Sequence, residues 1–153
     1  MVTPLERVFP GLASAAYRVT SPFDPDYNCI AWAAGDTRKW WWPGPDLERE
    51  HWPAGVAREL TRAAFQAAFA SMGYLACDSE EWEPGFEKIA IFGDDQGQPR
   101  HAARQLANGR WTSKLGRGED IEHGLHDVAG QLYGSVLLVM KRPVAPVQEE
   151  IRK

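Results

Sequence analysis

A series of short extended segments in the second half of the chain constrains the fold most. Residues 88–92 are mostly apolar, a turn-rich stretch follows at 93–99, and residues 100–106 form the next extended segment. Asn108-Gly109 is a strong local signal for a tight hairpin turn, and it leads into residues 110–115. Strands joined by such short turns run antiparallel, so this part of the chain predicts an antiparallel sheet.

Two helical segments are expected ahead of this sheet. The first carries Cys29 and ends near Gly35, and either Asp26 or Asn28 can cap its start. The second covers residues 55–74, where apolar side chains recur at four-residue steps and form one stripe. Helices followed by an antiparallel sheet are typical of an α+β domain.

The remaining segments complete a single-domain layout. Residues 119–128 predict one short helix, and residues 133–141 predict a buried final strand. An extended lead-in is expected over residues 1–20 and a flexible tail over 143–153. The predicted architecture is one α+β domain over residues 1–142, with N-terminal helices packed on an antiparallel sheet of about four to five strands.

Charge and hydropathy argue against two classes of partner. The 17 basic and 21 acidic residues give a net charge of −4, and the basic residues are scattered, so no nucleic acid partner is expected. The sequence has no apolar run near the roughly 20 residues that span a bilayer, and its N-terminus lacks the apolar core of a signal peptide. We therefore expect no membrane partner, and a cytoplasmic location or export without a classical signal peptide.

The sequence contains no recognisable metal-binding or nucleotide-binding motif. The histidines and cysteines form no CxxC or HExxH pattern, and the glycines match no phosphate-binding loop, so no metal and no cofactor is expected. The segment from His123 to His126 is interpreted as an exposed helical turn. Cys29 and Cys77 are expected to be reduced, with Cys77 a small buried side chain.

Cys29 and His101 are the residues best suited to chemistry. A thiol at the start of a helix lies near unpaired N–H groups and the helix dipole, which lower its pKa and can hold an oxyanion. A histidine presented from a strand can act as its general base. Arg100 and Arg104 alternate with His101 along the strand, so both should point away from it. The competing interpretation is a structural cysteine and an unrelated histidine.

This order of elements resembles the papain-like superfamily, and especially its small bacterial NlpC-type peptidases and amidases. The resemblance rests on Asn28-Cys29-Ile30-Ala31-Trp32-Ala33 opening a helix and on the predicted hairpin 101–114. It implies a cysteine hydrolase that cleaves an amide or isopeptide bond of a peptide or protein through a thioester. Cys29 would be the nucleophile and His101 the base.

The resemblance also implies a third polar residue that orients the imidazole. Counting across the hairpin places the position opposite or diagonal to His101 among Ser113, Lys114 and Leu115. Ser113 is the candidate there, and Asp120 just beyond the strand is the competing candidate. The oxyanion would be held by the backbone N–H of Cys29 together with the side chain of Asn28 or Tyr27.

Trp40-Trp41-Trp42 is the most unusual stretch of the sequence. Three consecutive side chains cannot share one side of a strand or helix, so the segment either packs over the core as a loop or leaves a surface for binding. On the second interpretation these tryptophans line a substrate groove or dock a protein partner. The alternative function is thus a non-catalytic protein-binding module of the same fold, with a toxin-associated or defence role as a third hypothesis.

Overall fold

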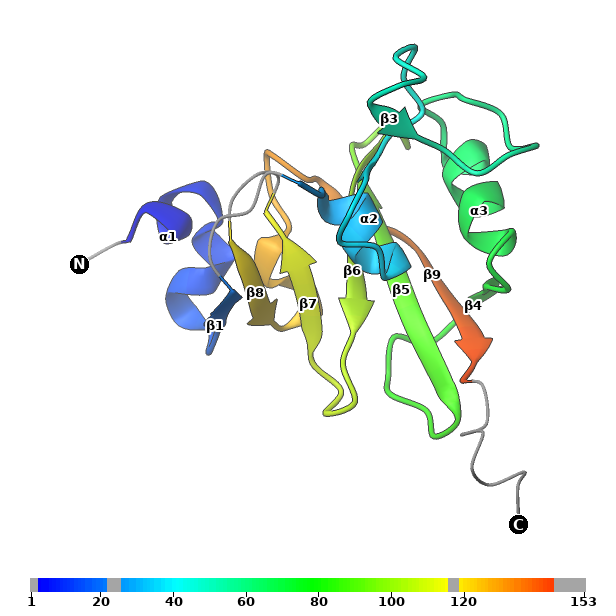
Figure 1. The fold of residues 1–153 in the computed structure, drawn as a ribbon. Helices are drawn as coiled ribbons and strands as arrows, with labels where there is room; N and C mark the ends of the chain where they lie inside the picture. Colours follow the sequence, from blue (N-terminus) through cyan, green and yellow to red (C-terminus); the bar gives the residue numbers. More distant parts are fainter. Residues whose placement is uncertain (1–2, 22–25, 116–118, 145–153) are drawn as a thin grey trace.

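The computed structural model describes residues 3–21, 26–115 and 119–144, and it is an α+β domain. Seven of its strands form one sheet in which every neighbouring pair of strands is antiparallel (Figure 1). In chain order these strands are β1 (Arg18–Ser21), β4 (Leu75–Cys77), β5 (Phe86–Gly93), β6 (Pro99–Gln105), β7 (Trp111–Lys114), β8 (Asp120–His123) and β9 (Ser135–Pro143). The order across the sheet is β1-β8-β7-β6-β5-β9-β4.

Short helices and one small parallel pair accompany the sheet. The α-helices are α1 (Pro4–Val8), α2 (Cys29–Ala34) and α3 (Arg62–Ala70), and the two 3-10 helices are η1 (Pro10–Ser14) and η2 (Leu125–Val128). The strands β2 (Trp40–Trp41) and β3 (Glu50–His51) pair in parallel beside α2. Figure 1 shows α2 in front of β5 and β6, with α3 beside the β9 end of the sheet. No helix in the described part of the chain is long and apolar enough to cross a bilayer.

The sheet is buried on both faces because alternate residues of its central strands enter different cores. Ile89 and Ile91 of β5 pack with the side chains of α2 and α3, whereas Ala90 and Phe92 pack with Leu12 and the η2 side chains. Strand side chains point to opposite faces with a period of two, so β5 separates two hydrophobic clusters. A strand covered on both faces reads as a continuous apolar run, as residues 89–92 do.

The helix α2 has the boundaries that its sequence predicted. Asn28 is the N-cap, with its Oδ1 accepting the N–H of Ala31, and Gly35 ends the helix in the left-handed conformation at φ 86°. The same Asn28 Oδ1 accepts the N–H of Trp41, and Asn28 Nδ2 donates to the Trp41 carbonyl. One side chain therefore fixes both the start of α2 and the position of β2.

The prediction of a helix over residues 55–74 is too long. The helix α3 begins only after Thr61, whose hydroxyl accepts the N–H of Ala64 and caps it. Val56 and Leu60 lie ahead of this cap and still pack against the core from the preceding loop. The apolar spacing predicted which side chains are buried, but the Thr61 cap sets the residue at which the backbone becomes helical.

The prediction of one helix over residues 119–128 is wrong in its first half. Residues 120–123 form β8, which pairs with both β7 and β1, and only Leu125–Val128 are helical. The lead-in 1–20 is not extended throughout, since it contains α1, η1 and the start of β1. These strands raise the described sheet from the expected four to five strands to seven. Most of the expected tail, residues 145–153, lies outside the described part of the chain.

Gly134 and Gly97 offer a matched test of backbone packing. Both have positive φ values, 75° and 82°, but a Cβ at Gly134 would collide with the backbone of Gly93, whereas a Cβ at Gly97 would meet open space. We expect Gly97→Ala to lower the free energy of unfolding by about 1 kcal/mol, the cost of the left-handed conformation. Gly134→Ala should cost about 3 kcal/mol or more because strain and collision add. Urea denaturation measures both, and equal losses would contradict the packing seen at Gly134.

Candidate functional site

Cys29 is the first residue of α2 and is buried, with 7% of its surface exposed. Its sulfur lies within hydrogen-bonding reach of three backbone N–H groups, those of Ala102, Ile30 and Cys29 itself. The last two are N–H groups of the first helical turn, which have no partner within a helix. The third belongs to β6, so the thiol joins the start of the helix to the sheet.

The position of Cys29 follows from a short β6–β7 ladder. These strands pair only at Arg104–Thr112 and Gln105–Trp111, although both continue past the first of these pairs. The Ala102 N–H, beyond the end of this ladder, is near enough to the Cys29 thiol to act on its pKa. The thiol therefore lies beside the backbone that carries His101, the residue before Ala102.

His101 is fully buried and held by three groups. Its Nε2 is 2.9 Å from the Ser113 hydroxyl, and its ring stacks on Tyr133 at a centroid distance of 3.8 Å and an interplanar angle of 4°. Phe92 contacts the ring edge-on at 5.3 Å. Among the described residues, His101 Nδ1 has no hydrogen-bond partner although it is buried. A buried ring nitrogen without a partner is unusual and marks a candidate base.

Cys29 and His101 approach the sheet from opposite faces. Cys29 belongs to the core that contains Ala102 and α2, whereas Phe92 and Tyr133, which hold His101, belong to the other core. Tyr133 stacks on His101, and its hydroxyl has a raised pKa, chiefly because of burial and to a smaller extent because of the charge of a Cys29 thiolate. As expected, Arg100 and Arg104 point away from His101, the first to Asp94 and the second over the Trp32 ring.

Of the two candidates for the third residue, the structure places Ser113 beside His101. Asp120 lies on the α2 face, where its Oδ2 accepts the hydroxyls of Tyr27, at 2.8 Å, and of Ser21. The Tyr27 hydroxyl thus serves Asp120, and the Asn28 amide serves Trp41, so both expected oxyanion donors are engaged elsewhere. The backbone N–H of Cys29 is the donor that remains from that expectation.

His123 is a site residue that the sequence interpretation missed. Its Nε2 is 2.7 Å from the Ser113 hydroxyl, and its Nδ1 is 2.6 Å from the Gly124 carbonyl oxygen. The expectation of an exposed helical turn here is wrong, because His123 is fully buried on β8. The alternation in Asp120-Ile121-Glu122-His123 after a glycine-rich turn was the signal available for a strand. His126, in contrast, is exposed and pairs with Glu80.

Burial makes the neutral forms of Cys29 and His101 the stable ones. The expected lowering of the Cys29 pKa at the start of the helix is therefore wrong. Burial raises the pKa of Cys29 to about 11, although the three N–H groups and the charge of Lys114 act in the opposite direction. Burial, with a smaller effect of His123, holds the pKa of His101 well below its ordinary value. At neutral pH the site therefore contains a thiol and an uncharged imidazole rather than an ion pair.

The tryptophan segment is mostly packed inside the protein. Trp41 is buried and donates its Nε1–H to Asp36, while Trp42 is half-buried with its ring edge-on to Phe65. Trp40 is also half-buried. The segment therefore packs over the core, as one interpretation expected, but Trp40 and Trp41 form β2 rather than a loop. This packing leaves less aromatic surface for docking.

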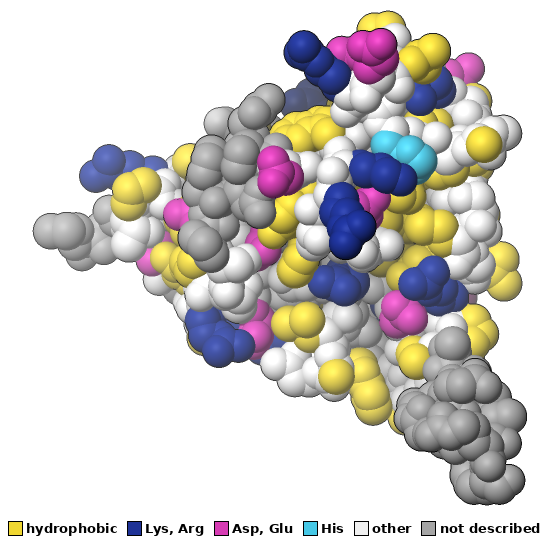
Figure 2. Space-filling model, in the orientation of Figure 1, with side chains coloured by type: hydrophobic (Ala, Val, Ile, Leu, Met, Phe, Trp, Pro, Cys, Tyr) yellow, Lys and Arg dark blue, Asp and Glu magenta, His cyan; other side chains and the backbone are white. Residues whose placement is uncertain are grey.

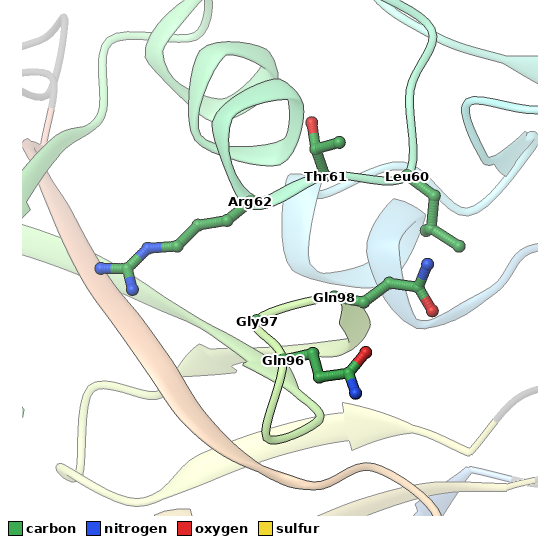
Figure 3. Close-up of a pocket in the computed structure, with 6 residues that line it drawn as sticks. All are labelled: Leu60, Thr61, Arg62, Gln96, Gly97 and Gln98. Carbon is green, nitrogen blue, oxygen red and sulfur yellow. The ribbon is translucent and has the colours of Figure 1, made fainter.

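Two surface features lie apart from these residues. The hollow in Figure 3 is lined by Leu60, Thr61, Arg62, Gln96, Gly97 and Gln98, where the start of α3 faces the turn before β6. Basic and acidic side chains are interspersed on the face that α2 covers (Figure 2).

Within residues 3–21, 26–115 and 119–144, no group of three or more His, Cys, Asp or Glu side chains could hold a metal ion.

Comparison with known proteins gives one match. Residues 18–141 match the family model described as a domain of unknown function (DUF7689). The chain belongs to this family. No curated protein and no solved structure matches the chain. The matched region of this DUF7689 member begins at β1 and ends within β9, so it covers all of the seven-stranded sheet except the last two residues of β9, and it includes Cys29, His101, Ser113 and His123.

The buried histidines should make the protein sensitive to acid. A lowered pKa in the folded state means that the unfolded chain binds protons first, so stability is full above the ordinary histidine pKa of about 6.5 and is lost as pH falls below it. The expected slope is up to about 1.4 kcal/mol per pH unit for each histidine that stays neutral. Denaturation midpoints across this range should fall less steeply for His101→Gln. The exposed His126→Gln is the control, and an equal slope in both variants would contradict the assignment.

Proposed function

We propose that this DUF7689 protein is a cysteine hydrolase that cleaves an amide or isopeptide bond, with Cys29 as nucleophile and His101 as general base. One observation carries the proposal. His101 Nε2 is held by Ser113 while His101 Nδ1 is buried without a partner among the described residues, and the backbone N–H of the following residue, Ala102, faces the Cys29 thiol. A base held at one ring nitrogen and unoccupied at the other is suited to accept a proton.

The first half of the reaction forms a thioester. Because the resting thiol is neutral, His101 Nδ1 takes its proton as the sulfur attacks the carbonyl carbon of the substrate. The carbonyl oxygen becomes an oxyanion, and the backbone N–H of Cys29 is the donor placed to stabilise it. The carbon–nitrogen bond then breaks, and the proton on His101 goes to the leaving amine.

The second half restores the enzyme. His101 removes a proton from water, and the resulting hydroxide attacks the thioester carbonyl. The carbon–sulfur bond breaks, the carboxylic acid leaves, and the sulfur recovers the proton from His101. Tyr133 keeps the imidazole plane fixed throughout, since the two rings are only 4° from parallel. The substrate is a peptide or a protein; candidates are a peptidoglycan stem peptide, a side-chain amide and a protein terminus.

Alkylation by iodoacetamide tests the base without knowledge of the substrate. His101 should raise the fraction of Cys29 that reacts at neutral pH, because it accepts the thiol proton. We expect His101→Gln to lower the rate of Cys29 labelling by at least about tenfold. Cys77, a half-buried cysteine on β4, is the internal standard in the same molecule. Mass spectrometry of the two peptides gives both rates.

The outcomes of the labelling experiment are distinct. A fall in Cys29 labelling with unchanged Cys77 labelling supports the dyad, because a general loss of structure would expose and accelerate both thiols. Unchanged labelling of Cys29 in His101→Gln would overturn the base role and favour the non-catalytic binding module.

Hydrolysis gives the complementary test. Peptidoglycan stem peptides and a library of fluorogenic peptide amides are incubated with the wild type and with Cys29→Ala. Loss of the nucleophile should reduce any cleavage by at least about a thousandfold, as for other covalent hydrolases. Cys77→Ala is the matched control and should retain full activity. Cleavage that survives Cys29→Ala would show that the hydrolysis comes from another source.

A further inference from the structure

The buried His123 completes a chain of hydrogen bonds behind His101 that has no role in the reaction steps proposed above. The chain runs from the Gly124 carbonyl through His123 and the Ser113 hydroxyl to His101, with successive distances of 2.6, 2.7 and 2.9 Å. All three side chains are fully buried, so each bond needs one donor and one acceptor. The group at one end of the chain therefore fixes which atom donates and which accepts in every bond.

The Gly124 carbonyl oxygen sets that direction because it can only accept. His123 Nδ1 must then carry the proton and donate to it. Burial lowers the pKa of His123, so its ring is neutral and its Nε2 is an acceptor. The Ser113 hydroxyl donates to that nitrogen, which leaves its oxygen lone pairs to accept the Nε2–H of His101.

We infer that His123 is a positioning residue, which acts through Ser113 to keep the proton of His101 on Nε2 and the basic lone pair on Nδ1. The inference rests on the proposed function, because it assigns His123 a purpose only if His101 is the base. A serine alone does not select a tautomer, since its hydroxyl can donate or accept. The Nε2 acceptor of His123 takes the serine proton, so the serine oxygen can only accept from His101, and this selects the Nε2–H tautomer of His101.

The surroundings of the two rings favour this neutral arrangement. Desolvation has the largest effect on the pKa of His123 and favours the neutral ring, and the charge of Arg110 acts in the same direction. The hydrogen bond to the Gly124 carbonyl and the charges of Asp127 and Glu122 favour a proton and only partly offset it. His101 faces Phe92, Tyr133 and Ser113, and Tyr133 stays protonated because its pKa is raised. A neutral pair joined by a hydroxyl avoids the burial of a charge.

Two substitutions at His123 separate the hydrogen bond from the packing. His123→Gln keeps a side-chain oxygen that can accept the Ser113 hydroxyl, so His101 should remain protonated on Nε2. His123→Leu removes the acceptor, so the hydroxyl is released to donate to His101 Nε2 and the ring proton moves to Nδ1. Long-range 1H–15N correlation of the histidine rings reports which nitrogen of His101 carries the proton. Iodoacetamide labelling of Cys29, with Cys77 as standard, is measured on the same samples.

The inference expects Nε2–H in the wild type and in His123→Gln, and Nδ1–H in His123→Leu. Cys29 labelling should fall about tenfold in His123→Leu and stay within about twofold of the wild type in His123→Gln. A wild-type His101 protonated on Nδ1 would overturn the inference without any variant, as would an unchanged tautomer in His123→Leu. A tautomer that moves while Cys29 labelling stays constant would instead overturn the base role of His101, and with it the proposed function.

Discussion

The structure depends on a sheet that is buried on both faces. Because alternate residues of β5 and β6 enter separate cores, each polar side chain on these strands must find its partner within the protein. Thr112 accepts the Trp32 indole N–H on one face, and Ser113 joins His101 to His123 on the other. The same double burial moves the pKa of Cys29 upward and that of His101 downward, so one constraint shapes both the packing and the chemistry of the site.

The end of the β6–β7 ladder is the second determining feature. A regular ladder would use the backbone N–H groups between the strands, and the start of α2 could not reach the sheet there. Here the ladder stops at Arg104–Thr112, the Ala102 N–H faces the Cys29 thiol, and the side chains of His101 and Ser113 bridge the strands instead. The Cys29 thiol therefore lies beside the backbone of Ala102, the residue after His101, although the side chains of Cys29 and His101 belong to different cores.

Local signals predicted the elements that local interactions control. Asn28 and Gly35 bound α2, and Asn108-Gly109 turns the β6–β7 hairpin with Gly109 at φ 87°, because caps and tight turns are made within a few residues. The apolar stripe over residues 55–74 predicted a helix longer than α3, because apolar spacing indicates burial whereas the Thr61 cap sets where the helix starts. Residues 120–123 were taken as helix because what makes them a strand is pairing with β7 and with β1, a hundred residues away in sequence.

The sequence by itself determined the class of the fold, the helix that presents Cys29 and the strand that presents His101, and it narrowed the position across the hairpin from His101 to residues 113–115. Each of these depends on neighbours along the chain or on one short turn. Only the tertiary structure decided that His123 lies behind Ser113, that Asp120 faces Tyr27 instead, and that His101 Nδ1 is buried without a partner. These facts depend on which strands pair and which face each side chain enters, and the free energy of burial that sets them is a property of the whole packed sheet.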